Sequence, residues 1–325
     1  MGKSPVEMGT AETAEWLRNR DCFLVLTHRR PDGDTLGCAG ALVEGLRELG
    51  KTAYVLFNQE ATPRYIDLVE EYWAPETYEP KEVITVDTAR TELLTDNAAK
   101  YAKKISLCID HHPTNDMYAE HTYLDATAAS CGELIYEVIM ALCGKVNKKA
   151  AGFLYAAIST DTGCFAFANT TANAFRISAL LIEFGAPHRE LNKRYFRTKS
   201  RKRVMVEGMV YSSLEFYYDG VLAISTITRE MMETSGADED DLDDIASLPG
   251  AVEGVRAAVT IRELTSKDDC KISVRTSSKE IDASKICAYF GGGGHVMAAG
   301  ASVRLTAPEI KAMVIAVFAE LTHRQ

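Results

Sequence analysis

Carboxylate and imidazole side chains gather in four short segments of the sequence. They are His28, Asp32 and Asp34 in the first segment, then Asp87, then Asp110-His111-His112, and finally Asp161. These side chains supply the oxygen and nitrogen ligands that divalent metal ions prefer. One ion needs fewer ligands than this set offers, so the sequence predicts two ions, about 3.5–4 Å apart and sharing one carboxylate. Such a pair activates water for attack on a phosphoryl group. We therefore predict hydrolysis of a phosphate ester or anhydride.

The ligand types also indicate which metal is bound. The four segments contain no cysteine, and the eight cysteines of the chain are scattered without a C-x-x-C pair. Carboxylates mixed with imidazoles favour Mn²⁺ first, with Mg²⁺, Co²⁺ or Fe²⁺ as alternatives. A zinc ribbon or a thioredoxin-like site has no support.

Buried strands precede three of the four segments. The apolar runs Phe23–Thr27, Ala53–Phe57, Val83–Val86 and Ile105–Ile109 are typical of strands covered on both faces. Helical patterns lie between and after them, at Leu36–Leu49, Gly132–Leu142 and Lys148–Ile158. This alternation predicts an α/β fold with a doubly wound, mostly parallel sheet. Ligands of such sheets bind outside the carboxyl ends of the strands, where the acidic segments are expected.

Each acidic segment taken alone also fits a structural role. An aspartate after a strand commonly caps a helix or forms a turn. Four such groups at one sheet edge are harder to explain in this way, because like charges packed together without cations repel one another and lose hydration. The set as a whole therefore favours a metal site.

The second half of the sequence has a different pattern of predicted helices and strands. A helical region extends from about Thr170 to Met209, with one break at Gly185-Ala186-Pro187. Strand patterns then alternate with helical ones, and the charged turn Ser266–Asp269 predicts a hairpin between two strands. We predict a catalytic domain over residues 1–185, a helical linker over 186–211 and a smaller α+β domain over 212–325.

Composition excludes several classes of protein. The chain has 325 residues and a net charge of −10, which argues against a protein that coats long nucleic acid through a basic face. No apolar run is long enough to span a bilayer, and the polar N-terminus lacks the apolar region of a signal peptide. We expect a cytoplasmic protein without a membrane partner.

The four segments resemble the motifs of the DHH phosphoesterase superfamily, which is named for the sequence found here as Asp110-His111-His112. The resemblance continues in the second half. There, Gly291–Gly294 and His295, followed by Ala298-Ala299-Gly300, are similar to the glycine-rich signature of the DHHA1 domain. Length and the short connection between domains look most like the group of nanoRNases and pAp phosphatases. This resemblance implies degradation of very short RNA oligonucleotides and removal of the 3′-phosphate of pAp.

The resemblance also implies roles for individual residues. His28, Asp32 and Asp87 would hold one metal ion, and Asp34, Asp87, His111 and Asp161 the other, with Asp87 bridging. His112 would contact the scissile phosphate, and Asp110 would orient the histidines. In the second domain, Arg275 would grip a terminal phosphate of the substrate, while Gly292, Gly293, Gly294 and His295 would lie close to its phosphate or sugar.

Two other functions stay open at this stage. A phosphodiesterase of linear or cyclic dinucleotides would carry the same ligands, and a substrate panel separates it from a pAp phosphatase. A nucleotide-binding regulatory protein without turnover would be expected to lack one or more ligands, whereas every expected position is filled. The sequence leaves open whether the chain forms a homodimer.

Overall fold

The computed structural model describes residues 5–242 and 244–323, so Met1–Ser4, Asp243 and residues 324–325 lie outside the description. The chain divides into two compact units, Met1–Thr198 (unit 1) and Lys199–Gln325 (unit 2), and each has its own hydrophobic core. The boundary falls inside the predicted linker, and the predicted domain bounds stay a prediction. None of the helices within the described ranges combines the length and apolar character that a membrane crossing requires.

Unit 1 is built on a six-stranded sheet with the strand order β1-β6-β5-β4-β2-β3. All of its strand pairs are parallel, which confirms the predicted sheet. The strands are β1 (Val6–Glu7), β2 (Phe23–Leu26), β3 (Ala53–Val55), β4 (Glu82–Val86), β5 (Leu107–Asp110) and β6 (His121–Leu124). The sequence did not indicate β1 and β6, which are short and lie at one side of the sheet.

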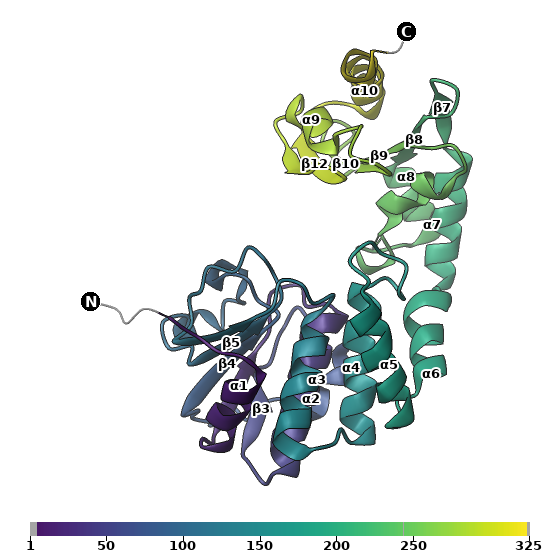
Figure 1. Ribbon diagram of the computed structural model, residues 1–325. Coiled ribbons are helices and arrows are strands. Elements are labelled where there is room, and N and C mark those ends of the chain that lie inside the picture. The colour runs from purple at the N-terminus through teal and green to yellow at the C-terminus, as the bar shows by residue number, and fades with distance from the viewer. Residues whose placement is uncertain (1–4, 243, 324–325) are drawn as a thin grey trace. The chain divides into compact units, whose positions relative to one another are not determined.

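The two faces of this sheet are covered differently. Successive side chains of a strand point to opposite faces, so Phe23 and Val25 enter the main core while Leu24 and Leu26 enter a second, smaller core. The main core is shared with α1 (Thr10–Arg18), α2 (Gly33–Glu48), α3 (Cys131–Cys143), α4 (Lys148–Asp161) and α5 (Ala172–Glu183). These helices run beside one another in Figure 1. The smaller core is closed by loops and short 3₁₀ helices, including η3 (Thr91–Leu93) and η4 (Ala99–Tyr101).

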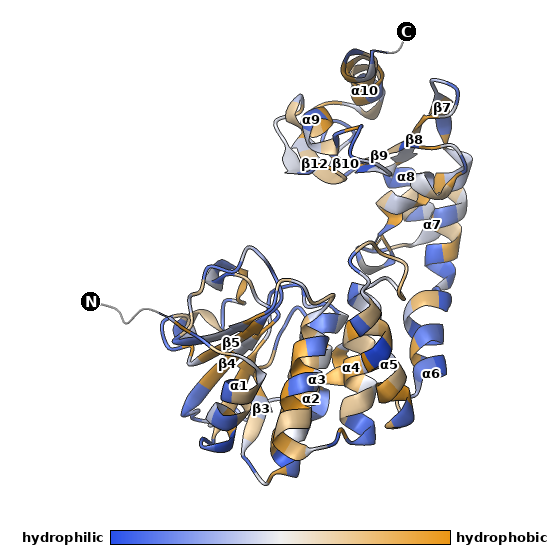
Figure 2. Cartoon of the chain, in the orientation of Figure 1, coloured by the Kyte–Doolittle hydropathy of each residue, from blue (hydrophilic) through white to orange (hydrophobic). Residues whose placement is uncertain are grey.

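Helices α2 and α4 approach each other closely. A Cβ atom on Gly37 of α2 would lie 2.6 Å from the carbonyl oxygen of Phe153 in α4, so only glycine permits this spacing. Much of both helices is apolar and buried (Figure 2). Both are longer than predicted, because Asp32 caps α2 at Gly33 and α4 continues to Asp161. Asp34 therefore lies in the first turn of α2, and Asp161 is the last residue of α4.

The helical region contains two breaks, so the prediction of a single break is wrong. After α5 come α6 (His188–Asn192) and a π-helical turn, Lys193–Arg197, and the chain then leaves the helix before α7 (Arg201–Ser212). The hydroxyl of Ser200 accepts a hydrogen bond from the Arg203 backbone N–H and caps the new helix. This second break separates the two units.

Unit 2 contains a second six-stranded sheet, of mixed direction, in the order β11-β12-β10-β9-β8-β7. Its strands are β7 (Glu215–Tyr217), β8 (Leu222–Ile227), β9 (Ala257–Glu263), β10 (Cys270–Thr276), β11 (Gly293–His295) and β12 (Ala298–Val303), and its helices after α7 are α8 (Arg229–Ser235), α9 (Ala283–Ala288) and α10 (Ala307–Thr322). The antiparallel pairing of β9 with β10 confirms the predicted hairpin. The helical pattern of Leu242–Leu248 predicts an α-helix, and this prediction is wrong for the described residues of the stretch, which belong to two 3₁₀ helices, Asp240–Leu242 and Ile245–Ala251.

Candidate metal centre

The six predicted metal ligands come together at one edge of the unit 1 sheet. Strands β5, β4 and β2 are neighbours in the sheet, so their carboxyl ends deliver Asp110, Asp87 and His28 to the same edge. Three overlapping groups form there, and the ligand atoms of each group lie within 4.8 Å of one another. The groups are His28, Asp32 and Asp87; Asp34, His111 and Asp161; and Asp87, His111 and His112.

Asp87 is common to two of these groups and lies at the centre of the site. Its Oδ2 atom is 3.6 Å from His28 Nε2, and its Oδ1 atom is 3.4 Å from His111 Nε2. The side chain is 3% exposed, and Oδ1 is buried without a hydrogen-bond partner. The residue also has a φ of +51°, which few non-glycine residues adopt. A buried carboxylate oxygen without a donor fits a site that a cation completes.

The spacing between the side chains is that of ligands around an ion. His111 Nε2 lies 3.9 Å from Asp34 Oδ2 and 3.8 Å from Asp161 Oδ2, and His28 Nε2 lies 3.8 Å from Asp32 Oδ1. These distances exceed the range of good hydrogen bonds, which ends at about 3.2 Å. Ligands about 2 Å from a shared ion are separated by such distances. The donor set therefore fits divalent ions.

Backbone carbonyls orient two of the imidazoles. His28 Nδ1 lies 2.8 Å from the Arg29 carbonyl oxygen, and His111 Nδ1 lies 3.2 Å from the carbonyl oxygen of Ala128. A carbonyl only accepts, so each Nδ1 carries the hydrogen and each Nε2 is left to face the carboxylates. Such contacts fix the tautomer and ring orientation of ligating histidines.

The start of α3 holds Asp34. The backbone N–H of Cys131 donates to Asp34 Oδ2 at 2.8 Å, and that of Gly132 donates to Oδ1 at 3.0 Å. The thiol of Cys38, one turn further along α2, donates to Oδ1 at 3.2 Å. The unpaired N–H groups of a helix N-terminus stabilise a carboxylate, which compensates for burying Asp34 almost completely.

Asp32 and Asp161 are fixed by local contacts. Asp32 Oδ1 accepts hydrogen bonds from the backbone N–H groups of Asp34 and Thr35 as the N-cap of α2. Asp161 Oδ2 accepts from Asn169 Nδ2 at 3.4 Å, and the same amide also donates to the Ala129 carbonyl oxygen. Asp32 therefore caps a helix and also belongs to a ligand group, so its structural role does not exclude a role in metal binding.

The third segment forms a hydrogen-bonded chain. Asp110 is fully buried, and its Oδ1 lies 2.8 Å from His112 Nδ1. Its Oδ2 accepts from Asn115 Nδ2 at 2.6 Å. The sequence alone did not indicate that Asn115, Asn169 and Cys38 contact the site. Asn115 lies in the segment that directly follows Asp110, the last residue of β5, and this closeness in sequence was the one signal available for it.

In the metal-free site, the close packing of carboxylates and imidazoles shifts the pKa values of several of these groups. Burial lowers the pKa of His28, but the nearby carboxylates of Asp32 and Asp87 raise it to about 11. Burial also opposes the charge on His111, yet its contact with Asp87 and the nearby carboxylates raise its pKa to about 10. Burial, followed by repulsion from Asp87, raises the pKa of Asp34 well above its usual range. Without cations the site takes up protons to offset its carboxylates, and a bound cation removes that need.

The predicted substrate residues lie in unit 2. Arg275 is on β10, half-buried, and donates to its neighbouring carbonyl on Val274. Gly293, Gly294 and His295 form the exposed edge strand β11. Gly292 and Gly294 must be glycine, since a Cβ on them would lie 2.2 Å from the Gly300 carbonyl oxygen and 2.6 Å from that of Ala298. These residues belong to unit 2, whereas the three ligand groups belong to unit 1.

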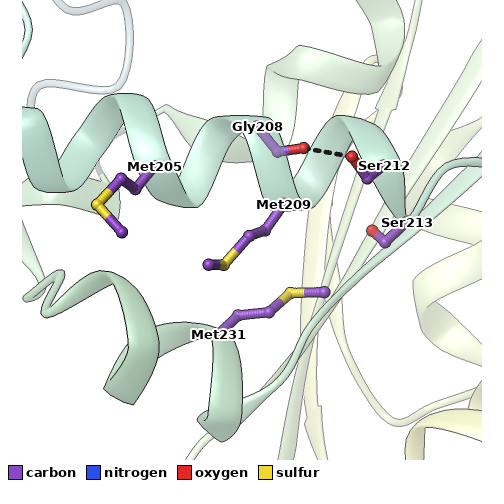
Figure 3. Close-up of a pocket in the computed structure, with 6 residues that line it drawn as sticks. All are labelled: Met205, Gly208, Met209, Ser212, Ser213 and Met231. Carbon is purple, nitrogen blue, oxygen red and sulfur yellow. Dashed lines mark hydrogen bonds between the residues drawn. The ribbon is translucent and has the colours of Figure 1, made fainter.

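A separate hollow in unit 2 has a different character. It is an open groove of about 540 Å³ between α7 and α8, lined by Met205, Gly208, Met209, Ser212, Ser213 and Met231 (Figure 3). The hydroxyl of Ser212 donates to the Gly208 carbonyl oxygen within α7. The lining holds no titratable side chain, so this groove supplies no group for acid–base or metal chemistry.

Comparison with known proteins agrees with this geometry. The model of the DHH family, N-terminal domain, matches residues 22–158, and that of the DHHA1 domain matches residues 221–321. The chain is 31% identical to the bifunctional oligoribonuclease and PAP phosphatase NrnA of Bacillus subtilis, over 87% of this chain and 90% of the relative. It is 32% identical to the NrnA of Thermus thermophilus, over 86% of this chain and 83% of that relative.

A solved structure shares the fold. An exopolyphosphatase-related protein from Bacteroides fragilis matches with a TM-score of 0.81 and 21% identity, over 97% of this chain and 96% of that protein. At this identity the likeness concerns the fold alone. The two matched domains and the relatives above 30% identity show that the chain belongs to the DHH family of metal-dependent phosphoesterases, with a C-terminal DHHA1 domain.

Proposed function

We propose that this phosphoesterase hydrolyses short RNA oligonucleotides and the 3′-phosphate of pAp, using two divalent ions, with Mn²⁺ the first choice. The observation that supports this most is the position of Asp87, whose two oxygens face different histidines across two ligand groups. The names of the NrnA relatives supply the substrate class.

The ligand groups suggest how the ions are held. His28, Asp32 and Asp87 would bind one ion, and Asp34, Asp87, His111 and Asp161 the other. When bound, the pair supplies a water molecule of lowered pKa and positive charge for the phosphoryl oxygens. The chain itself contributes the pre-set Nε2 atoms of His28 and His111, so little reorganisation is needed on binding.

We assign His112 a direct role on the substrate. Its side chain is 43% exposed, whereas His28 and His111 are 18% and 13% exposed, so His112 is the imidazole most open to a ligand. Asp110 holds its Nδ1, which leaves Nε2 free to contact the scissile phosphate and to hold the proton that the leaving oxygen needs.

Unit 2 would supply the nucleotide contacts. Arg275 can bind a terminal phosphate through its forked guanidinium, and the N–H groups of β11 with His295 can approach a phosphate or sugar closely. A grip on one end of the substrate would limit its length. It would also explain how an acidic chain handles nucleic acid.

A substrate panel tests the proposal. The purified protein with Mn²⁺ is assayed on pAp, on RNA of two to five nucleotides, on a linear and a cyclic dinucleotide, and on a 20-nucleotide RNA. We expect turnover of pAp and the short RNAs and little activity on the long RNA. Activity confined to the cyclic dinucleotide would instead identify a dinucleotide phosphodiesterase. Binding of these ligands without turnover, in protein containing its metals, would identify a regulatory protein.

A further inference from the structure

An exposed aromatic side chain lies in the loop that follows the predicted ligand Asp161. Phe167 is 56% exposed, and no other large apolar side chain of the described chain is more exposed. The loop joins α4 to α5, and Asp161 is the last residue of α4. Phe167 is therefore an exposed aromatic side chain six positions after a predicted metal ligand.

Several contacts hold this ring in place. A Cβ atom on Gly163 would lie 2.4 Å from the Phe167 ring, so the ring rests directly on the backbone of Gly163, two residues after Asp161. Gly163 also has a φ of +57°, which suits glycine. The backbone N–H of Phe167 donates to the Thr162 carbonyl oxygen at 3.0 Å. The ring therefore has a supported face and a fixed backbone, both tied to the ligand segment.

The far end of the loop is tied to the ligand itself. Asn169 Nδ2 donates to the backbone carbonyl oxygen of Asp161 at 3.1 Å and to its side chain at 3.4 Å. Phe167 thus lies between two points, Thr162 and Asn169, that are bonded to the Asp161 segment. Its position relative to that carboxylate is set by the fold and does not depend on a substrate.

The other aromatic residue of the loop behaves differently. Phe165 stacks on Phe175 of α5, with ring centroids 4.9 Å apart, and contacts Tyr155 of α4 at 6.3 Å. Phe165 therefore joins the loop to the helices. Within the described ranges Phe167 makes no ring-to-ring contact of this kind, and its outer face is open.

We propose that Phe167 is a platform on which a nucleobase of the substrate stacks, next to the phosphate that the metal centre hydrolyses. This inference rests on the proposed function and adds the element that recognises the base. A base is joined to its phosphate through one ribose, so a base whose phosphate is at the centre can reach only neighbouring loops. Stacking on an aromatic face accepts every base, which suits an enzyme acting on mixed RNA fragments.

The test crosses an enzyme change with a substrate change. Phe167→Ala and the unaltered protein are assayed with Mn²⁺ on two ribodinucleotides, one with both bases and one that is abasic throughout. From the strength of base–aromatic stacking, we expect kcat/KM on the base-bearing substrate to fall by about 5- to 150-fold in the variant. On the abasic substrate, which the unaltered protein should already cleave poorly, the variant should match the unaltered protein.

Three further variants separate stacking from other roles. Phe167→Trp should retain kcat/KM on the base-bearing substrate, whereas Phe167→Leu, apolar but without a π face, should lose most of it. Phe216→Ala is the matched control, since Phe216 is 49% exposed on the edge strand β7, and it should leave both substrates unaffected. Mn²⁺ binding to Phe167→Ala, measured by calorimetry without substrate, should equal that of the unaltered protein.

The outcomes distinguish this inference from the proposed function. An equal loss on both substrates, or weakened Mn²⁺ binding in Phe167→Ala, would show that the ring only supports the Asp161 loop and would overturn the inference. Unchanged kcat/KM on the base-bearing substrate would overturn it as well. If the unaltered protein cleaves no oligonucleotide and no pAp, it is the proposed function that fails.

Discussion

The Oδ1 atom of Asp110 lies 2.8 Å from Nδ1 of His112, and this contact determines which nitrogen of the imidazole faces outward. Because an ionised carboxylate only accepts, Nδ1 carries the hydrogen, and Nε2 is left unbonded toward the site. The same hydrogen bond is the main reason that the pKa of His112 is raised. Asn115 completes the arrangement by donating to the other oxygen of Asp110.

Replacing Asp110 with asparagine should lower kcat by about 10- to 100-fold, the usual range for groups that orient functional histidines. The amide keeps the shape of the side chain but can turn its N–H toward Nδ1, which would reverse the tautomer. The measurement is kcat on pAp with saturating Mn²⁺. Asp116→Asn, at a half-exposed surface position paired with Arg90, serves as control and should leave kcat unaltered. A normal kcat for Asp110→Asn would show that the tautomer of His112 is unimportant.

Asp87→Asn should abolish turnover and weaken the binding of both ions. Asparagine tolerates the positive φ of this position, so the variant should fold. It also removes one of the charges that repel Asp34 and Asp161, so the metal-free variant should melt at the same temperature as the unaltered protein or higher. Mn²⁺ should raise the melting temperature of the unaltered protein only. Retained turnover, or a normal shift with Mn²⁺, would contradict the bridging role.

Metal affinity should increase with pH. In the metal-free site the pKa values of His28 and His111 are raised to about 11 and about 10, so both imidazoles hold a proton at neutral pH. An imidazole must lose that proton to bind a metal, and each displaced proton gives about a tenfold gain in affinity per pH unit. Calorimetric titration with Mn²⁺ between pH 6 and 8, in buffers of different ionisation enthalpy, measures both the gain and the protons released. A pH-independent affinity would contradict the raised values.

Stability of the metal-free protein should show the opposite trend. A histidine whose pKa is raised from 6.5 to about 10 in the folded state stabilises it fully below pH 6.5 and less as the pH approaches 10. Between pH 7 and 10 the metal-free protein should therefore lose the part of its thermal stability that protonated His111 provides. His111→Gln should show a smaller loss over the same range in differential scanning calorimetry.

The sequence indicated where several candidate ligands meet, because they directly follow strands that apolar runs mark clearly. Asp87 after Val83–Val86 is the simplest case, since four buried residues fix both the strand and the place where it ends. Neighbouring parallel strands then bring such ends together without any further information. The hairpin of unit 2 was predictable for a similar reason, because a charged turn separates two alternating runs.

Other features depend on contacts between residues far apart in the chain. The N–H groups that hold Asp34 belong to Cys131 and Gly132, which lie nearly a hundred positions away. The early start of α2 depends on Asp32 as its cap, which the apolar periodicity from Leu36 onward does not register. Strand β11 contains two glycines, which are poor strand formers, and forms only because β12 pairs with it.

Arg275→Ala should raise KM for pAp and short RNA by about tenfold or more, since charge-assisted bonds to phosphate are among the stronger polar contacts. It should change kcat little, because Arg275 belongs to unit 2 and the ligand groups to unit 1. Lys271→Ala is the matched control, because Lys271 is also a cation on β10 and its side chain lies on the same face of the strand as that of Arg275. A similar rise in KM for both variants would indicate a general effect of charge.

Gly37→Ala should destabilise unit 1 and reduce activity together. The added Cβ would lie 2.6 Å from a backbone oxygen of α4, so the two helices must separate, at a cost of about 1–3 kcal/mol. The new Cβ would also approach the backbone of Ala157 in α4. Asp34 lies one turn before Gly37, and Asp161 lies one turn after Ala157, so separation of the helices moves two predicted ligands apart.

Gly208→Ala provides the comparison, because Gly208 lies inside α7 with open space around it. This variant should gain about 1 kcal/mol of stability from helix propensity. Urea unfolding of the metal-free variants, followed by circular dichroism, should therefore shift in opposite directions. A neutral Gly37→Ala would show that α2 can move without disturbing the ligand groups, and Mn²⁺ binding to that variant should then be normal.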